Sequence, residues 1–322
     1  MTSIKDVAKH AGVAISTVSK VLNNYPNISE ATRKKVNEAV EELNFVPNSV
    51  AAALSSKNAG RVALMIDLNV ITQAIDEVAM RYISGALTKA MELNLDVITL
   101  FVFMFQNKTT EEVIRYLQSQ SISGIIIYGA SEDDYVLQEL VASEKFKCVT
   151  VDQNHVGDNT SSVTIDHKKA QKEVAKTLIE EDGAKKVLYI SGYEKSYVTR
   201  NRLQGMEEVA LEKGIELVVK NGDFLEDKAT EIAMQYGKDV DAIVCASDLM
   251  AMGAKAAMKK MQIERPICGF DGISLLGYAG HGIYTIDQNF SQISAMAMEE
   301  LHRLMSGETG RIIEAEYSLI KN

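Results

Sequence analysis

The feature that most constrains the fold of this chain is the regular alternation, from residue 61 onward, of short apolar runs with amphipathic helical stretches. Near-continuous apolar runs separated by helices indicate the strands of a parallel sheet that is buried on both faces. Eight runs have this character, at residues 62–66, 97–103, 124–128, 148–151, 187–191, 216–219, 242–246 and 266–270. Because eight such units are too many for one small sheet, we predict two doubly wound halves.

Polar side chains follow the predicted strands of the second half. Ligands in folds of this type bind at the carboxyl ends of the strands. The strand ends lead here to a cation, an aromatic ring and two carboxylates, which are Arg202, Phe224, Asp248 and Asp271. A guanidinium can fork onto hydroxyls or a carboxylate, a phenyl group can stack on a ring, and Asp271 can accept sugar hydroxyls. The sequence therefore predicts a polar small-molecule cleft, with Asp248 capping the helix that follows it.

The first 46 residues have the pattern of three short helices. The first carries an apolar stripe, begins with Ser3 and Asp6 in capping-box spacing, and stops at Gly12. A second follows with Val18 on its inner face, and a third begins after Ser29, which is a suitable N-cap. A small residue, a glycine turn and a branched apolar residue at this spacing suit two helices that cross steeply. This is the plan of a helix-turn-helix head, whose second helix enters the DNA major groove.

The outward positions of that second helix offer one methyl-rich contact, three hydroxyls and one cation, which are Ile15, Ser16, Thr17, Ser19 and Lys20. Hydroxyls suit phosphate oxygens, whereas Lys20 can read the O6 and N7 atoms of guanine. The alternative is a helical hairpin that contacts another protein. The basic bias of the segment and its hydroxyls favour DNA.

The charge is distributed unevenly along the chain. The whole chain carries 34 basic and 44 acidic side chains, a net charge of −10. Residues 1–58 hold seven basic and five acidic side chains, a charge of +2, so the remainder carries −12. A basic head on an acidic body predicts that contact with nucleic acid is confined to the head and the segment beside it.

Four segments, at residues 4–13, 16–23, 32–36 and 44–51, closely resemble the head of the lactose-repressor (LacI/GalR) family. Weaker matches extend over nearly the whole chain. The resemblance implies an N-terminal all-α helix-turn-helix head with a hinge helix, joined to an α/β periplasmic-binding-protein-like body of two doubly wound parallel-sheet subdomains. It also implies a homodimer that binds a near-palindromic double-stranded DNA operator and responds to a small molecule.

The resemblance assigns roles to individual residues. The family's base-reading positions are occupied by Ile15, Ser16 and Lys20, with Leu54 as a wedge inserted from the minor groove. Its phosphate-contacting positions are occupied by Thr17, Ser19, Asn23, Ser29 and Asn48. Its effector-contacting positions are occupied by Arg202, Phe224, Ser247 and Asp271. A purely structural role for any of these body residues, or a Leu54 that only packs on the body, is the alternative.

The chain departs from the family pattern at several positions. Ala14 stands where serine usually opens the reading helix, which removes a cap worth about 1 kcal/mol. Ala52 replaces a long polar hinge residue, and Asp67 and Asn289 stand where proline is usual. No aromatic residue of residues 69–78 matches the one that often faces the effector. A sugar or phosphosugar is therefore expected, with purine-type ligands, or a phosphorylated carrier protein in place of a small molecule, as alternatives.

The expected domains are a head at residues 1–46, a hinge helix and linker at 47–58, and a body at 59–322. Within the body, one subdomain is expected at about 59–160 plus 289–318, and the other at about 161–288 plus the C-terminal end. The alanine-rich hinge is only about two turns long, so it is expected to fold only on DNA. The last residues show no leucine heptad, which favours a dimer over a tetramer.

Other classes of protein are disfavoured by what the sequence lacks. It contains no G-x-G-x-x-G, P-loop or G-x-S-x-G run, and its five histidines have no metal-ligand spacing, so neither an enzyme nor a metal or other cofactor is expected. No apolar run approaches the about 18 residues of a membrane span. The start does not resemble a secretion signal, as a secreted sugar-binding protein would require, and the three cysteines lie in apolar runs. We therefore expect a cytoplasmic protein.

Overall fold

The computed structural model describes residues 2–22, 25, 27–45, 60–67 and 77–321. The chain divides into two compact units, Met1–Gly60 and Arg61–Asn322. We describe each unit separately, as a head and a body.

The head contains α1 (Ile4–Ala11), α2 (Ile15–Leu22) and α3 (Glu30–Glu42). Its core is formed by small and β-branched side chains from all three helices, which are Val7, Ala8, Val18, Val21, Val36 and Ala39. The predicted capping box is present, because the Ser3 side chain accepts from the backbone of Asp6 and the Asp6 side chain accepts in return. Gly12 ends α1 with a φ of 65°, a conformation that costs glycine little. The helix-turn-helix prediction is thus confirmed.

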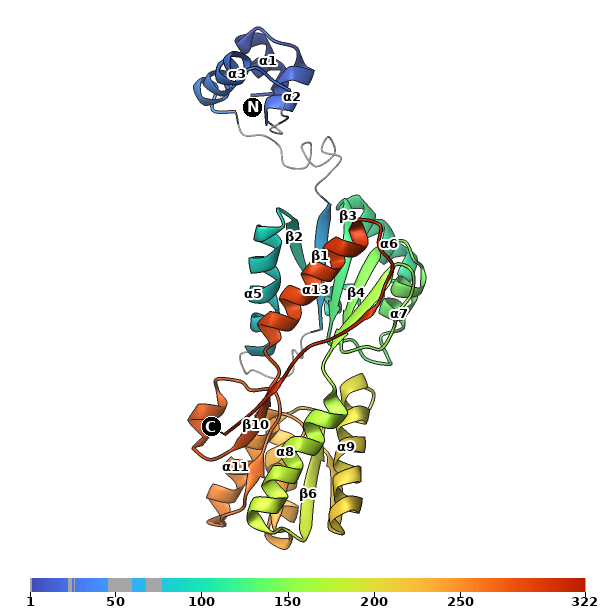
Figure 1. Ribbon diagram of the computed structural model, residues 1–322, viewed down its shortest axis with the longest axis vertical. Helices are drawn as coiled ribbons and strands as arrows, with labels where there is room; N and C mark the ends of the chain where they lie inside the picture. The colour runs from blue at the N-terminus through green and yellow to red at the C-terminus, as the bar shows by residue number, and fades with distance from the viewer. Residues whose placement is uncertain (1, 23–24, 26, 46–59, 68–76, 322) are drawn as a thin grey trace. The chain divides into compact units, whose positions relative to one another are not determined.

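The first sheet of the body has the strand order β11-β5-β4-β3-β1-β2, and every neighbouring pair in it is parallel. Its strands are β1 (Arg61–Ile66), β2 (Asp96–Phe101), β3 (Ile122–Tyr128), β4 (Lys147–Val151), β5 (Thr160–Thr164) and β11 (Ile312–Glu314). In β1, alternate residues enter two different cores, with Leu64 on one face and Met65 on the other. As Figure 1 shows, α5 (Glu77–Glu92) and α13 (Phe290–Met305) cover one face, whereas α6 (Thr110–Ser119) and α7 (Tyr135–Ala142) cover the other.

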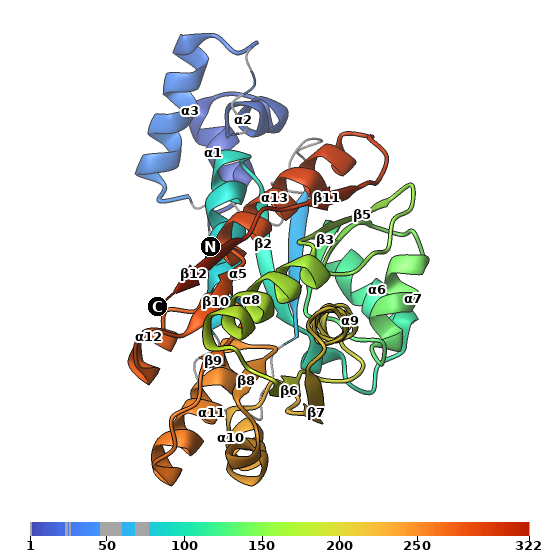
Figure 2. The same cartoon turned by 60° about the horizontal axis from the view of Figure 1, so that its bottom comes forward.

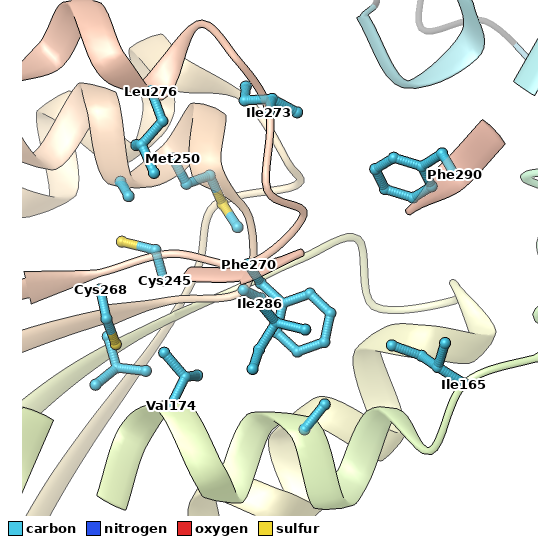
Figure 3. Close-up of a cluster of buried hydrophobic side chains, with 14 of the residues drawn as sticks. Ile165, Val174, Cys245, Met250, Cys268, Phe270, Ile273, Leu276, Ile286 and Phe290 are labelled. Carbon is cyan, nitrogen blue, oxygen red and sulfur yellow. The ribbon is translucent and has the colours of Figure 1, made fainter. Parts of the chain in front are cut away.

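The second sheet has the order β12-β10-β9-β8-β6-β7 and is parallel except for the pair β10 and β12. Its strands are β6 (Lys186–Ser191), β7 (Glu216–Asn221), β8 (Ala242–Cys245), β9 (Ile267–Cys268), β10 (Tyr284–Asp287) and β12 (Ser318–Lys321). The helices α8 (His167–Asp182) and α9 (Tyr197–Lys213) pack as one pair, and α10 (Glu226–Tyr236) and α11 (Asp248–Met261) as another. Figure 3 shows the core on either side of this sheet, with Val174 of α8 on one face and Met250 of α11 and Leu276 of the short α12 (Leu276–Ala279) on the other.

The two predicted doubly wound halves are confirmed, although several strand limits differ. The run at 97–103 is a strand only to Phe101, after which Val102–Phe105 forms a 3₁₀ turn. The four strands β5, β10, β11 and β12 were not predicted. Because β5 pairs with β4, the chain leaves the first sheet after Thr164, so the expected boundary near residue 160 falls inside the first sheet.

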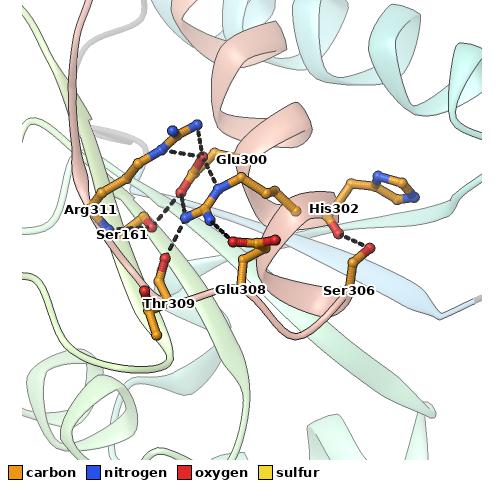
Figure 4. A network of polar contacts seen from close by, with 8 residues as sticks. Ser161, Glu300, His302, Ser306, Glu308, Thr309 and Arg311 are labelled. Carbon is orange, nitrogen blue, oxygen red and sulfur yellow. Dashed lines mark hydrogen bonds and ion pairs between the residues drawn. The ribbon is translucent and has the colours of Figure 1, made fainter.

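Within the described residues, the chain passes between the sheets after β5, after β10 and after β11. The second passage leads into α13, which lies beside α5 in both Figure 1 and Figure 2. A buried carboxylate, that of Glu300, holds the chain near the third passage. It accepts hydrogen bonds from Ser161 of β5 at 2.7 Å and from the guanidinium groups of Arg303 and Arg311 (Figure 4). This network ties α13 and the segment before β11 to β5 of the first sheet.

Candidate DNA-binding face and ligand cleft

The two faces of α2 differ sharply in burial. Val18 and Val21 lie in the head core, whereas the side chains of Ile15, Ser16 and Lys20 are exposed. Ile15 leaves 45% of its surface exposed, although it is a large apolar side chain. The structure therefore presents the three predicted base-reading residues together on one surface of one helix.

The predicted phosphate-contacting residues are less uniform. Thr17 and Ser19 are half-buried on α2, and Ser29 is exposed at the start of α3, where its hydroxyl accepts from the backbone N–H of Thr32 at 3.3 Å. Ser29 is thus the predicted N-cap. The remaining predicted DNA contacts, Asn23, Asn48 and Leu54, lie outside the described residues, as does the whole of the predicted hinge at 47–58.

In the body, the Arg202 side chain is buried at the centre of a polar cluster. Its Nη1 donates to the carbonyl oxygen of Ala246 at 2.6 Å, and its guanidinium lies 3.8 Å from the centre of the Phe270 ring. The carboxylate of Asp271 is 3.6 Å away. Arg202 and Asp271 thus meet at the carboxyl ends of the strands, as expected for a parallel sheet. Most of the guanidinium is engaged within the protein.

Two residues of this cluster, His167 and Asp152, were not predicted. Nε2 of His167 lies 2.8 Å from Oδ1 of Asp152, and its Nδ1 lies 3.4 Å from Nε of Arg202. Burial alone would raise the pKa of the Asp152 carboxyl, but His167 and Arg202 outweigh burial and lower it. Asp152 follows β4 directly, so the strand-end rule that found Arg202 could have found it too.

Asp271 sits in a backbone conformation that is rare for its residue type, with a φ of 126°. Its carboxylate accepts a hydrogen bond from Nε2 of Gln288 at 2.8 Å. Burial raises the pKa of Asp271, Arg202 opposes this, and the nearby Asp248 carboxylate adds to the increase. The Oε1 atom of Gln288 is buried without a hydrogen-bond partner in the described part of the chain, so one acceptor beside Asp271 is left for a donor from a ligand or water.

Phe224 and Gly192 form a close contact beside the cluster. Phe224 has a φ of 61°, and a Cβ atom at Gly192 would lie 2.0 Å from Cζ of its ring. Only a glycine at this position allows the ring to lie against the end of β6. Phe224 is half-buried, so part of its ring faces outward.

The capping role expected for Asp248 needs correction. Ser247, and not Asp248, is the N-cap of α11, because its hydroxyl accepts from the backbone N–H of Met250 at 3.3 Å. The buried Asp248 carboxylate instead accepts from the Thr285 hydroxyl at 2.6 Å and from the Ile273 backbone at 2.9 Å. It therefore shapes the loop that carries Asp271.

A cavity of about 310 Å³ adjoins the Arg202 cluster through Asp152, which lines both. Its walls come from the segment after β4 and the start of α9, namely Asp152, Gln153, Asn154, His155, Tyr197, Arg200 and Asn201. Other hydrogen bonds and ion pairs also join the two halves of the body. Asp133 accepts from Tyr193 at 2.8 Å and pairs with Lys195, and Arg81 of α5 donates to the carbonyl oxygen of Gly272 at 3.1 Å.

Two further observations concern metal binding and membrane insertion in the described residues. None of their His, Cys, Asp and Glu side chains form a group of three or more that could hold a metal ion. No helix in the same part of the chain is long and apolar enough to span a bilayer.

Two family models match the chain. The model described as bacterial regulatory proteins of the lacI family matches residues 3–48. The model of periplasmic binding proteins and the sugar binding domain of the LacI family matches residues 79–296, more than half of the chain.

Two relatives match almost the full length of this chain. Catabolite control protein A of Staphylococcus aureus (strain Mu50) is 29% identical over 325 residues, which span 95% of this chain and 93% of that protein. The HTH-type transcriptional regulator RegA of Clostridium saccharobutylicum is 29% identical, with the same coverage.

The solved structures share the fold. The lac repressor dimer bound to operator and the anti-inducer ONPF superimposes with a TM-score of 0.84 at 23% identity, covering 99% of this chain and 98% of that chain. A complex of the transcriptional regulator CelR with cellobiose gives 0.70 at 23% identity, covering 100% and 99%. The chain therefore belongs to the LacI family of bacterial regulatory proteins.

Proposed function

We propose that this LacI-family regulator is a repressor that binds a near-palindromic operator as a homodimer. A sugar bound in the body would raise or lower its affinity for this operator. The observation that carries this proposal is the buried polar cluster around Arg202, which lies at the strand ends in a chain whose head exposes Ile15, Ser16 and Lys20. We also propose that it acts in the cytoplasm, where a chromosomal operator would lie. The body then serves for binding and not for catalysis.

For the head, we propose that α2 lies in the major groove. Ile15, Ser16 and Lys20 would contact base edges, and five polar residues would hold phosphates, which are Thr17, Ser19, Asn23, Ser29 and Asn48. Leu54 would enter the minor groove once the hinge at residues 47–58 folds on the operator. The exposed position of Ile15 on the same surface as Ser16 and Lys20 supports this assignment.

Replacing Lys20 with alanine is expected to weaken operator binding by about 1–3 kcal/mol and to relax the choice of one base pair. The reason is that a lysine on the groove-facing surface bonds to guanine only where guanine is present. Fluorescence anisotropy with an operator and its single-base variants measures both effects. Lys5→Ala, which removes an exposed lysine of α1, is the control. An equal loss of affinity on every sequence would show that Lys20 contacts phosphate.

For the body, we propose a sugar with several hydroxyls as the ligand. Arg202 and Asp271 would bond to hydroxyls, Phe224 would stack on the ring, and the unpartnered Oε1 of Gln288 would accept one more hydroxyl. Ser247 would contribute chiefly through the backbone that it caps. The CelR structure, which holds cellobiose, supports a sugar for this fold.

The test uses the full chain. Thermal shift against sugars, phosphosugars and nucleobases should give a higher midpoint with at least one sugar, because a ligand that binds only the folded state stabilises it by mass action. The same sugar should change the affinity for an operator selected from random DNA. If the protein selects an operator but none of these compounds raises its unfolding midpoint, the DNA-binding proposal stands and the sugar proposal is refuted. A response only to a phosphorylated carrier protein would favour that alternative.

A further inference from the structure

His167 forms a bridge between a residue of the first half of the body and a residue of the second. Asp152 follows β4 of the first sheet, whereas Arg202 lies on α9, beside the second sheet. The imidazole stands between them, with Nε2 at 2.8 Å from the Asp152 carboxylate and Nδ1 at 3.4 Å from both Nε and Nη2 of Arg202. Only 1% of the His167 side chain is exposed, so these two groups are its hydrogen-bond partners in place of solvent.

The chemistry of the partners determines where the ring carries its proton. A guanidinium has donors only, so Nδ1 of His167 must accept, and a carboxylate has acceptors only, so Nε2 must donate. The ring is therefore neutral and protonated on Nε2. Burial lowers the pKa of His167 below its ordinary value of 6.5, Asp152 opposes this, and Arg202 lowers the pKa further. The hydrogen-bond geometry and this pKa shift agree.

Several other ionisable groups surround the bridge. Asp166, at the N-cap of α8, adds negative charge on one side, and Asp271, whose pKa is raised by burial, lies 3.6 Å from Arg202 on the loop after β9. The buried phenol of Tyr82 on α5 interacts electrostatically with Asp152, Asp271 and Arg202. Any pH dependence of the cleft therefore has two main sources, His167 and Asp271, which separate variants can distinguish.

We propose that His167 is a positioning residue that holds the Nε and Nη2 side of the Arg202 guanidinium only while its ring is neutral, which makes binding at this cluster sensitive to protons. The effect on ligand binding rests on the sugar proposal above, whereas the bridge itself does not. When the ring gains a proton, Nδ1 becomes a donor that faces a donor-only guanidinium, and the contact is lost. The unfolded chain binds this proton more readily, so the bridge contributes stability above about pH 6.5 that is lost as the pH falls.

Two substitutions of His167 separate its contact with Arg202 from its contact with Asp152. The Oδ1 atom of asparagine can take the place of Nδ1, so His167→Asn keeps an acceptor for Arg202 and removes the ionisable group. The side-chain amide of glutamine reaches the position of Nε2, so His167→Gln keeps a donor for Asp152 and loses the acceptor for Arg202. His302→Asn, on an exposed histidine of α13, is the control.

The experiment is NMR on the ligand-free full chain. The ¹⁵N shifts of the His167 ring report the protonated nitrogen, and hydrogen exchange of the Arg202 Nε–H, assigned with Arg202→Lys, reports whether the guanidinium is held. Exchange of this group is catalysed by base and slows as the pH falls in a free side chain. We expect exchange in the wild-type chain to slow at least about tenfold less than in His167→Asn when the pH falls from about 7.5 to about 5.5, because protonation of His167 removes the acceptor for Nε–H.

The variants give the outcomes that decide the proposal. His167→Asn should keep slow exchange at both pH values, and His302→Asn should behave like wild type. His167→Gln should exchange fast throughout. A proton on Nδ1 of His167 near neutral pH, or the same pH profile in wild type and His167→Asn, would overturn the proposal even if His167→Gln failed to fold. With cellobiose as the probe, the absence of any thermal shift beside an intact NMR signature would count against the sugar and leave the bridge standing.

Discussion

Replacing Arg202 with alanine is expected to lower the affinity of the body for its sugar at least about 100-fold, which corresponds to about 2.7 kcal/mol. The side chain is the cation of the cluster, and its loss also strips a donor from the Ala246 carbonyl oxygen and from Nδ1 of His167. Truncating one partner of a buried charge network typically costs about 2–5 kcal/mol. Calorimetry with the sugar found by thermal shift measures the loss directly.

Two comparisons make this result specific. Arg202→Lys keeps the charge but not the planar fork, so it should recover only part of the affinity. Arg115→Ala, on an exposed arginine of α6, should have no effect on sugar binding. Operator affinity without sugar should be the same in all three variants, because the head is a separate unit. Unchanged calorimetry for Arg202→Ala would mean that Arg202 serves only the structure of the cleft.

Replacing Gly85 with alanine is expected to destabilise the body by about 3 kcal/mol, at the upper end of typical overpacking. A Cβ atom at this position of α5 would lie 2.0 Å from the carbonyl oxygen of Ser291 on α13. The obstacle is backbone and not a flexible side chain, so α5 and α13 must move apart. Thermal unfolding should show a midpoint lowered by about 5–10 °C.

Gly214→Ala is the matched control, because no atom lies within 4 Å of its added Cβ although its φ is 62°. Its cost should be only the backbone strain of about 1–2 kcal/mol that a left-handed conformation imposes on alanine. Equal losses for the two variants would show that α5 and α13 separate easily.

The elements that could be predicted from the sequence are those whose signal is local. The Ser3 and Asp6 cap, the turn at Gly12 and the apolar strand β1 each depend on residues close together in the chain. By contrast, β5 reads as a polar segment, and it was missed. Ser161 and Ser162 within it are fully buried because Glu300 and the backbone of Gln153 satisfy their hydroxyls. Those partners lie far away in sequence or in another loop, so no local pattern reports them.

The candidate site also has one part that the sequence predicts and one part that it does not. The convergence of Arg202 and Asp271 follows from the rule that ligands bind where parallel strands end, which a sequence can reveal once its strands are recognised. The cap of α11 was assigned to Asp248 but is Ser247, because two adjacent polar residues before a helix are equally plausible caps until the partners of each are known. Thr285 and Ile273 provide those partners for Asp248.

The sequence by itself determined the head, the doubly wound body and the strand ends at which a ligand site should lie, because periodicity and capping act over a few residues. Only the tertiary structure decided which polar groups meet in the cleft. Asp152, His167 and Arg202 come from different elements on both sides of the first passage between the sheets, and their hydrogen bonds exist only once those elements are packed. Burial then makes the pairing necessary, since a charge away from water needs its partner within reach.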